Sequence, residues 1–127
     1  MRRILIVEDS PTMRALVTVA LEGLSTAVKI TEAVSGFEAL RVLHGERFDL
    51  IVTDINMPDI NGLELVSFVK NSEPYRSIPL VIISTESSQR DRAKGLGLGA
   101  EAYLVKPFEP EALRQIVEDL LADSPEE

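Results

Sequence analysis

The segment Ile4-Leu-Ile-Val-Glu-Asp-Ser-Pro11 joins an apolar run to two carboxylates, a serine and a proline. A short, uninterrupted apolar run is typical of a β-strand that is buried on both faces of a parallel sheet. Ser10 is a good helix N-cap, and a proline in the first position of a helix sacrifices no hydrogen bond. The segment therefore predicts a buried strand, a polar strand end and a helix that begins at Pro11.

Similar apolar runs recur later in the chain. Because a central strand of a parallel sheet is covered on both faces, uniformly apolar runs predict central strands. A further segment, Val28–Val34, is less uniformly apolar and predicts an edge strand. The runs interpreted as central strands are Ile4–Val7, Leu50–Val52, Leu80–Ile83 and Ala102–Val105.

Segments with helical spacing of apolar residues separate these strands. Two amphipathic stripes, Met13–Leu24 and Leu113–Leu121, place apolar residues at intervals of three and four. Gly95 and Gly97 each cost about 1 kcal/mol relative to alanine inside a helix. We therefore expect the helix that contains them to be the least stable. The remaining helices are predicted over Gly36–Leu43, Gly62–Lys70 and Ser88–Leu98.

The alternation of strands and helices predicts the fold class. Five strand–helix units give an α/β fold, (βα)5, in which right-handed crossovers build a doubly wound, five-stranded parallel sheet with helices on both faces. With the second strand at the edge, the favoured strand order is 2-1-3-4-5. Ligands of such a sheet bind at the carboxyl ends of its strands.

Length and composition limit the class of protein. At 127 residues, with 45% hydrophobic and 27% charged residues, the chain has the size and composition of one globular domain. We expect the domain to span residues 1–122 and residues 123–127 to form a frayed acidic tail. The sequence contains no cysteine, which excludes disulfides, thiolate metal sites and cysteine nucleophiles.

Charge and hydropathy argue against two kinds of partner. A formal net charge of -8 disfavours direct binding to nucleic acid, because that affinity comes largely from Lys and Arg that neutralise phosphates. No apolar run approaches the ~20 residues needed to cross a bilayer, so we expect no membrane insertion. The chain is expected to be cytoplasmic.

Polar side chains follow each strand that is predicted to be central. Because the carboxyl ends of parallel strands share one edge of the sheet, residues that are far apart in the sequence are expected to converge there. Each could instead be a simple strand exit, a cap or a solvated charge, but several strand ends with complementary groups favour a common site. The residues are Glu8, Asp9, Asp54, Ser84, Thr85 and Lys106.

Carboxylates gathered at this edge would need a cation. Two of them at about 4 Å repel by roughly 4 kcal/mol at an effective dielectric constant near 20. Hard oxygen ligands in a partly hydrated cluster favour Mg²⁺, and without it the pKa of one carboxylate should be raised. Lys106 and the hydroxyl of Ser84 would suit the oxygens of a transferred phosphoryl group. The pattern therefore indicates phosphoryl transfer to a carboxylate.

Three motifs carry a resemblance to a known family. The motifs Val7-Glu-Asp-Ser-Pro-Thr-Met-Arg14, Thr53-Asp-Ile-Asn-Met-Pro-Asp-Ile-Asn-Gly62 and Tyr103-Leu-Val-Lys-Pro-Phe108 occur in this order at strand ends. They closely resemble the receiver domain of two-component response regulators, particularly single-domain CheY-like chemotaxis proteins. The resemblance extends from Ile4 to Leu121.

The resemblance implies roles for the residues at the strand ends. Asp54 would be the phosphoacceptor, and Lys106 would pair with the phosphoryl group. Mg²⁺ would be bound by Asp9, by Asp54 and by the backbone carbonyl of Asn56, and through water by Glu8. Glu8 replaces the aspartate of many family members and keeps its charge.

A second group of residues would change conformation in response to phosphorylation. Family spacing from the lysine selects Ser84 rather than Thr85 as the switch hydroxyl, although many relatives have threonine there. Tyr103 would move inward after phosphorylation, and the peptide bond before Pro107 would be cis.

Two further positions would set how long the phosphoryl group lasts. Asn56 and Glu86 match residue types that tune the attacking water in chemotaxis receivers. They imply a lifetime of seconds to minutes. Independently of the resemblance, the helix cost of Gly95 and Gly97 indicates that the fourth helix is loose at rest, so we expect phosphorylation to work partly by ordering it.

The resemblance also implies partners. A histidine kinase would donate the phosphoryl group, and a protein target would bind the surface formed by the fourth helix, fifth strand and fifth helix. A flagellar motor switch protein is one candidate for that target. The chain would not be an enzyme beyond its own phosphorylation and dephosphorylation.

Four alternatives stay open at this point. The chain could be a receiver excised from a larger regulator, or an interaction module that turns over no phosphate. A small aspartyl-phosphate hydrolase normally has Asp-x-Asp, whereas Asp54-Ile-Asn56 lacks the second carboxylate. A flavodoxin-like mononucleotide binder is disfavoured because Glu8 and Asp9 would repel phosphate.

His44 is interpreted as a solvated side chain, and Phe37, Phe48 and Phe68 as core residues.

Overall fold

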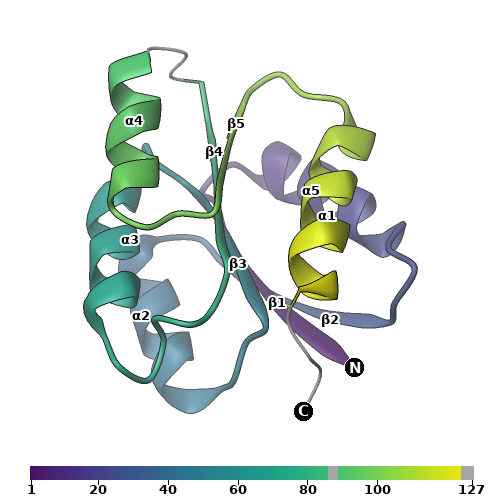
Figure 1. The fold of residues 1–127 in the computed structure, drawn as a ribbon, viewed down its shortest axis with the longest axis horizontal. Helices are drawn as coiled ribbons and strands as arrows, with labels where there is room; N and C mark the ends of the chain where they lie inside the picture. The colour runs from purple at the N-terminus through teal and green to yellow at the C-terminus, as the bar shows by residue number, and fades with distance from the viewer. Residues whose placement is uncertain (86–88, 124–127) are drawn as a thin grey trace.

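A computed structural model of the chain describes residues 1–85 and 89–123. Within these residues, strands and helices alternate as predicted (Figure 1), with element boundaries one to three residues from the predicted ones at most points. The strands are β1 (Arg2–Val7), β2 (Val28–Ala33), β3 (Leu50–Asp54), β4 (Leu80–Ser84) and β5 (Ala102–Val105). The helices are α1 (Pro11–Glu22), α2 (Gly36–Gly45), α3 (Gly62–Asn71), α4 (Gln89–Gly97) and α5 (Pro110–Ala122).

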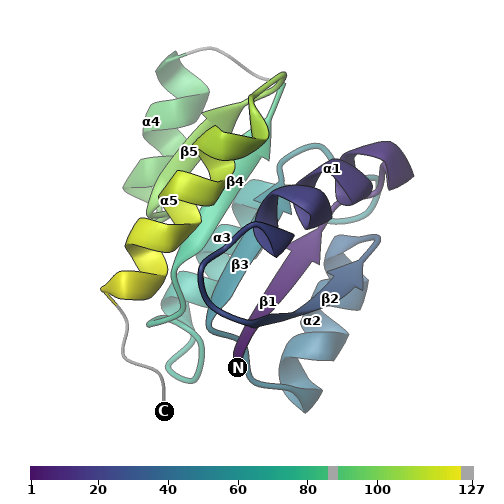
Figure 2. The same ribbon diagram turned by 90° about the vertical axis from the view of Figure 1, so that its right-hand side faces the viewer.

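The strands form one parallel sheet in the order β2-β1-β3-β4-β5, which confirms the predicted topology. Helices α1 and α5 cover one face of the sheet, and α2, α3 and α4 cover the other (Figures 1 and 2). Alternate strand residues feed two apolar cores, one on each face. Within the residues that the structure describes, no helix is long and apolar enough to span a membrane.

The ends of the helices follow from local chemistry. Ser10 caps α1, since its Oγ accepts a hydrogen bond from the Met13 amide at 3.3 Å, and Pro11 is the first helical residue. Pro110 likewise opens α5, although Glu109 provides no side-chain cap there. The start of α1 is therefore fixed by two local signals, a side-chain cap and a proline, whereas the start of α5 is fixed by the proline alone.

The pattern of apolar runs misplaced one strand. The apolar pattern of Ala102–Val105 predicts a central strand, but β5 lies at an edge of the sheet, as the predicted strand order requires, and of its residues only Tyr103 is buried. A four-residue run contains too little polar contrast to distinguish an edge strand from a central one. β1, β3 and β4 are almost entirely buried, as predicted for central strands.

Two of the three phenylalanines that were interpreted as core residues lie at the surface instead. Phe48 is buried, but Phe37 is 63% and Phe68 is 37% exposed. Phe37 is the second residue of α2, and Phe68 lies near the surface against Tyr75, with ring centroids 6.0 Å apart. His44 is exposed, as predicted, and its Nδ1 lies 2.7 Å from the Leu40 carbonyl oxygen.

Gly95 of α4 serves close packing, a role that the sequence did not reveal. A Cβ at Gly95 would lie 2.7 Å from Cδ1 of Ile82 and 3.5 Å from Cδ2 of Tyr103. A Cβ at Gly97 would meet nothing within 4 Å. Gly95 therefore lets the helix backbone approach the sheet. Gly97 has no such packing role, so it is the glycine whose main effect on α4 is to lower its helix propensity.

Candidate functional site

The register of the sheet brings the acidic strand ends together. Val7 of β1 pairs with Thr53 of β3, so the residues that follow them, Glu8 and Asp54, lie side by side. Asp54 in turn pairs with Ile83 of β4. The predicted convergence at the carboxyl edge is therefore a consequence of strand register.

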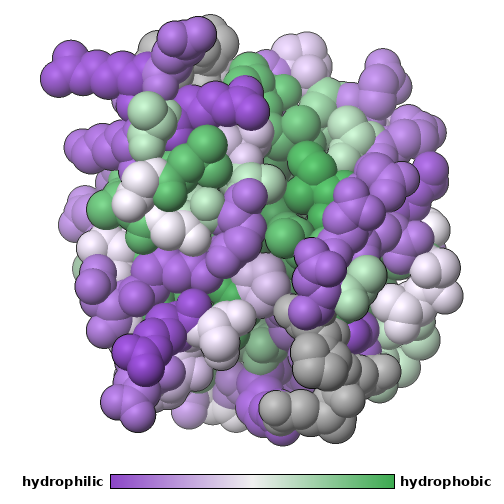
Figure 3. Space-filling model, in the orientation of Figure 1, coloured by the Kyte–Doolittle hydropathy of each residue, from purple (hydrophilic) through white to green (hydrophobic). Residues whose placement is uncertain are grey.

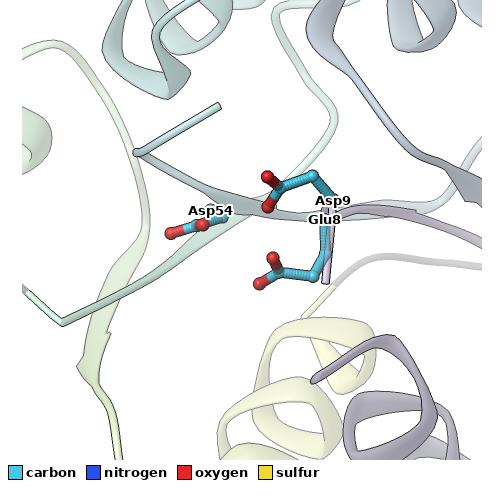
Figure 4. Close-up of side chains that lie close together, drawn as sticks. All are labelled: Glu8, Asp9 and Asp54. Carbon is cyan, nitrogen blue, oxygen red and sulfur yellow. The ribbon is translucent and has the colours of Figure 1, made fainter. Parts of the chain in front are cut away.

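Three carboxylates share this edge. Glu8, Asp9 and Asp54 each offer an oxygen, and these oxygens all lie within 4.8 Å of one another (Figure 4). Glu8 is 1% and Asp54 is 5% exposed, whereas Asp9 is open to solvent. The cluster is thus buried on one side and accessible on the other.

Lys106 places a positive charge among these carboxylates. Its Nζ lies 2.8 Å from Oε1 of Glu8 and 3.6 Å from Oδ2 of Asp54. The peptide bond from Lys106 to Pro107 is cis, the geometry that the family resemblance implies. In this structure the shorter contact of the lysine is therefore to the glutamate rather than to the candidate phosphoacceptor.

Burial shifts the ionisation of one of the carboxylates. The pKa of Glu8 is raised, chiefly because burial disfavours the charged carboxylate, and the nearby charge of Asp54 adds to the effect. Hydrogen bonds from Lys106 and from the Ser10 amide act in the opposite direction. The expectation of a raised carboxyl pKa is confirmed, although its main cause is burial rather than repulsion.

The backbone fixes the orientation of Asp54. Its Oδ1 accepts a hydrogen bond from the Ile55 amide at 2.8 Å, while Oδ2 faces Lys106. The first residue of α3, Gly62, packs directly on this backbone, since a Cβ there would lie 2.1 Å from the carbonyl oxygen of Asp54. Only glycine allows the helix to start so close to the site.

The two candidate switch hydroxyls have different surroundings. Ser84 is fully buried at the end of β4, and its carbonyl oxygen accepts a hydrogen bond from the Lys106 amide at 2.7 Å. Thr85 is exposed. The backbone of Ser84 thus lies beside that of Lys106, and the choice of Ser84 as the switch hydroxyl stays a prediction.

The other predicted site residues are distributed around the cluster. Tyr103 is already buried, with 5% exposure, so an inward movement on phosphorylation would start from a side chain that is inside. Asn56 is exposed, in the loop that follows β3. Glu86 lies outside the described residues.

This donor set suits a small, hard cation. Carboxylate oxygens from two adjacent strand ends, one of them exposed, can bind a divalent ion that keeps several waters, which is the usual coordination of Mg²⁺. An ion there would also relieve the cost of burying charged Glu8. The residues present therefore fit a magnesium site.

Two contacts around the site were not found from the sequence. Arg14 donates from Nη1 to the Glu8 carbonyl oxygen at 2.9 Å and from Nε to Glu32 at 3.0 Å. Asp59 accepts hydrogen bonds from the amides of Gly36 and Phe37 in α2. The contacts of Arg14 with Glu32 and of Asp59 with α2 join segments that are 18 or more residues apart, so no local signal marks them.

Comparison with known families and proteins gives a consistent result. The family model described as response regulator receiver domain matches residues 4–118. A chemotaxis protein CheY homolog of Campylobacter jejuni is 37% identical over 120 residues, covering 94% of this chain and 92% of that protein.

Solved structures agree with the sequence matches. The chemotaxis response regulator CheY4 of Vibrio cholerae superposes with a TM-score of 0.84 at 34% identity, covering 94% of this chain and 98% of that one. The signal receiver domain of a signal transduction histidine kinase from Syntrophus aciditrophicus gives a TM-score of 0.89 at 33% identity, covering 100% and 95%. The similarity therefore includes both a chemotaxis regulator and a receiver that belongs to a kinase.

Proposed function

This chain belongs to the response regulator receiver domain family, and we propose that it takes a phosphoryl group from a histidine kinase onto Asp54. The observation that carries the proposal is the position of the Lys106 ammonium group, between buried Glu8 and Asp54. A cation held against two carboxylates at an accessible edge suits a reaction in which negative charge arrives on a phosphoryl group.

The proposed transfer is an in-line displacement at phosphorus. Since the Ile55 amide holds Oδ1 of Asp54, we expect Oδ2, on the Lys106 side, to attack. The new oxygen–phosphorus bond forms as the phosphorus–nitrogen bond of the phosphohistidine breaks, and the leaving imidazole keeps the electron pair and takes up a proton. Lys106 then exchanges its contact with Glu8 for a phosphoryl oxygen.

Mg²⁺ would be held by Asp9, Asp54 and the Asn56 carbonyl, and through water by Glu8. Bound there, it would neutralise charge on the carboxylates and on the phosphoryl oxygens. Asn56 and Glu86 would set the lifetime of the product at seconds to minutes. On this proposal the chain catalyses only its own phosphorylation and dephosphorylation.

The output would travel through Ser84 and Tyr103. The Ser84 hydroxyl would bond to a phosphoryl oxygen, and the space that it leaves would stabilise the inward position of Tyr103. Because that side chain is already buried, we propose that phosphorylation increases the population of a conformation that the unmodified chain also adopts.

The proposed output surface consists of α4, β5 and α5. Hydrophobic side chains gather between α4 and α5, with hydrophilic ones on either side (Figure 3). A patch of this kind suits the docking of a protein target. The chemotaxis names of the relatives support a target in motility, a flagellar switch protein being the first to test, and a cytoplasmic location.

Acetyl phosphate and Mg²⁺ provide a direct test, with intact mass as the readout. We expect one labile phosphoryl group on the wild-type chain and none on Asp54→Asn. The matched control is Asp119→Asn, the same chemical change on exposed α5, which should be phosphorylated like the wild type. No adduct on the wild-type chain, or an unchanged adduct on Asp54→Asn, would overturn the proposal.

A further inference from the structure

The loop between β3 and α3, residues 55–61, carries Asn56 and is fixed at both ends. The Ile55 amide donates to Asp54 Oδ1 at 2.8 Å, and the Ile55 carbonyl oxygen accepts from the Gly62 amide at 2.8 Å. Near the helix, Asn61 caps α3, its Oδ1 accepting from the Leu63 amide at 2.7 Å. These bonds fix the two ends of the loop but make no contact with residues 56–60 between them.

Asp59 attaches the middle of the loop to α2. Its Oδ1 accepts from the Gly36 amide at 3.1 Å and from the Ile60 amide at 2.7 Å. Its Oδ2 accepts from the Phe37 amide at 2.9 Å. One carboxylate thus satisfies two amides at the start of α2, where Ser35 caps only the Glu38 amide. A negative charge at a helix N-terminus is also favoured by the helix dipole.

The two backbones meet where Asp59 joins them. A Cβ at Gly36 would lie 2.7 Å from Cβ of Ile60, closer than side chains approach one another. Because Cβ is fixed to the backbone, a side chain at Gly36 would force the loop away from α2. Glycine at this position and the carboxylate of Asp59 therefore serve the same contact.

The charge of Asp59 persists through the physiological pH range. The pKa of this carboxyl is lowered to about 2, first by the hydrogen bond from the Phe37 amide. Desolvation raises the pKa by less than the Phe37 hydrogen bond lowers it, and the hydrogen bonds from the Ile60 and Gly36 amides lower it further. The attachment is thus a charge-assisted contact at neutral pH.

We propose that Asp59 is a positioning residue of the phosphorylation site, which holds the β3–α3 loop against α2 so that the Asn56 carbonyl is preformed for Mg²⁺. Asn56, Met57 and Pro58 lie between two fixed points, Ile55 and Asp59. This inference rests on the proposed function, because it assigns Asp59 a role in the same metal site.

The test is a Mg²⁺ titration of the unphosphorylated chain by calorimetry. We expect Asp59→Asn to weaken Mg²⁺ binding about tenfold, the lower end of what loss of a contact behind a metal ligand causes. Hydrogen exchange at the amides of Gly36 and Phe37 should become faster in the same variant. Phosphorylation by acetyl phosphate should need more Mg²⁺ but should reach the wild-type rate at saturation, because Asp54 and Lys106 are untouched.

Two further variants separate positioning from charge and from folding. Glu38→Gln removes a negative charge from the same helix end without touching the loop, and it should change the affinity less than about twofold. Gly36→Ala keeps Asp59 but pushes the loop away, so it should weaken binding as Asp59→Asn does. Thermal unfolding monitored by circular dichroism establishes that each variant is folded.

The outcomes separate this inference from the proposed function. If the wild type binds no Mg²⁺ and accepts no phosphoryl group, the proposed function fails. If the wild type behaves as expected while Asp59→Asn and Gly36→Ala bind Mg²⁺ as tightly, only the positioning role fails. An equal loss in Asp59→Asn and Glu38→Gln would also overturn that role, because charge alone would then explain the effect.

Discussion

Helices α3 and α4 lie on the same face of the sheet, and each follows a strand that ends in a site residue (Figure 1). α3, after Asp54, is attached by Gly62, Leu65, Val66 and Val69, all buried. In α4, which comes after Ser84, the buried position is Gly95. The helix that follows Asp54 is therefore anchored by buried apolar side chains, whereas the helix that follows Ser84 is attached by a close backbone contact.

This difference separates two requirements of a phosphorylation switch. A metal cradle must be preformed, because ordering the chain at the moment of binding would weaken affinity. An output element must instead change with little energy, and elements with few buried apolar contacts open at low free-energy cost. Under the proposed function, α3 would meet the first requirement and α4 the second.

The largest effect is expected where α3 touches Asp54. In Gly62→Ala the new Cβ would meet the carbonyl oxygen of Asp54 at 2.1 Å, so α3 must shift. We expect a loss of about 3 kcal/mol or more in the free energy of unfolding, together with weaker Mg²⁺ binding. Urea denaturation measures the first effect and calorimetry the second. Gly45→Ala, in α2 at a site with nothing within 4 Å, is the control and should leave Mg²⁺ binding unchanged and cause no loss of stability.

A pair of leucines tests the same contrast by removing side chains. Leu65 of α3 is 1% exposed, and Leu65→Ala should cost about 3 kcal/mol because it opens a cavity in the core. Leu96 of α4 is 38% exposed, and Leu96→Ala should change the free energy of unfolding by less than about 0.5 kcal/mol. Similar losses for both leucines would show that α4 is anchored as firmly as α3.

The sequence predicts most of this arrangement because its strongest signals are local. Buried strands leave apolar runs, and polar residues follow them at Glu8, Asp54 and Lys106. Since parallel strands end at one edge, the acidic cluster follows once the strand order is known. The order itself depended on identifying Val28–Val34 as an edge strand.

What the sequence could not predict depends on contacts between distant segments. The bonds from Asp59 to α2 cross more than twenty residues of chain, and Gly95 looks the same in sequence whether it loosens a helix or packs it closely. The apolar pattern of Ala102–Val105 is too short to distinguish an edge strand from a central one, and only the predicted strand order places this strand at an edge. Phe37 is apolar, yet its place on α2 turns it outward.

Within α4, the two glycines should respond in opposite directions. Gly95→Ala places a Cβ 2.7 Å from Ile82, and we expect a loss of about 1 kcal/mol or more in the free energy of unfolding. Gly97→Ala meets nothing and should add about 0.5 kcal/mol through helix propensity. Urea denaturation measures both.

Hydrogen exchange relates these glycines to signalling. If phosphorylation orders α4, a phosphoryl mimic should slow exchange over residues 89–97, and Gly97→Ala should already be partly protected without it. Exchange over the buried part of α3 should change little. Equal protection of α4 with and without the mimic would contradict the idea that this helix is ordered by phosphorylation.

The smallest expected effect is in acid, at the contact between the loop and α2. The pKa of Asp59 is lowered from 3.8 to about 2, so the stability that it contributes is present above pH 3.8 and is lost as the pH falls through about 2. The difference in thermal midpoint between wild type and Asp59→Asn should therefore be constant above pH 5 or so and shrink below pH 4. Ser35→Ala removes a cap hydroxyl at the same helix end, and because a hydroxyl does not titrate there, its deficit should persist through the acid range. If the Asp59→Asn deficit persisted in the same way, the carboxylate would not be the group that ties the metal side of the site to α2.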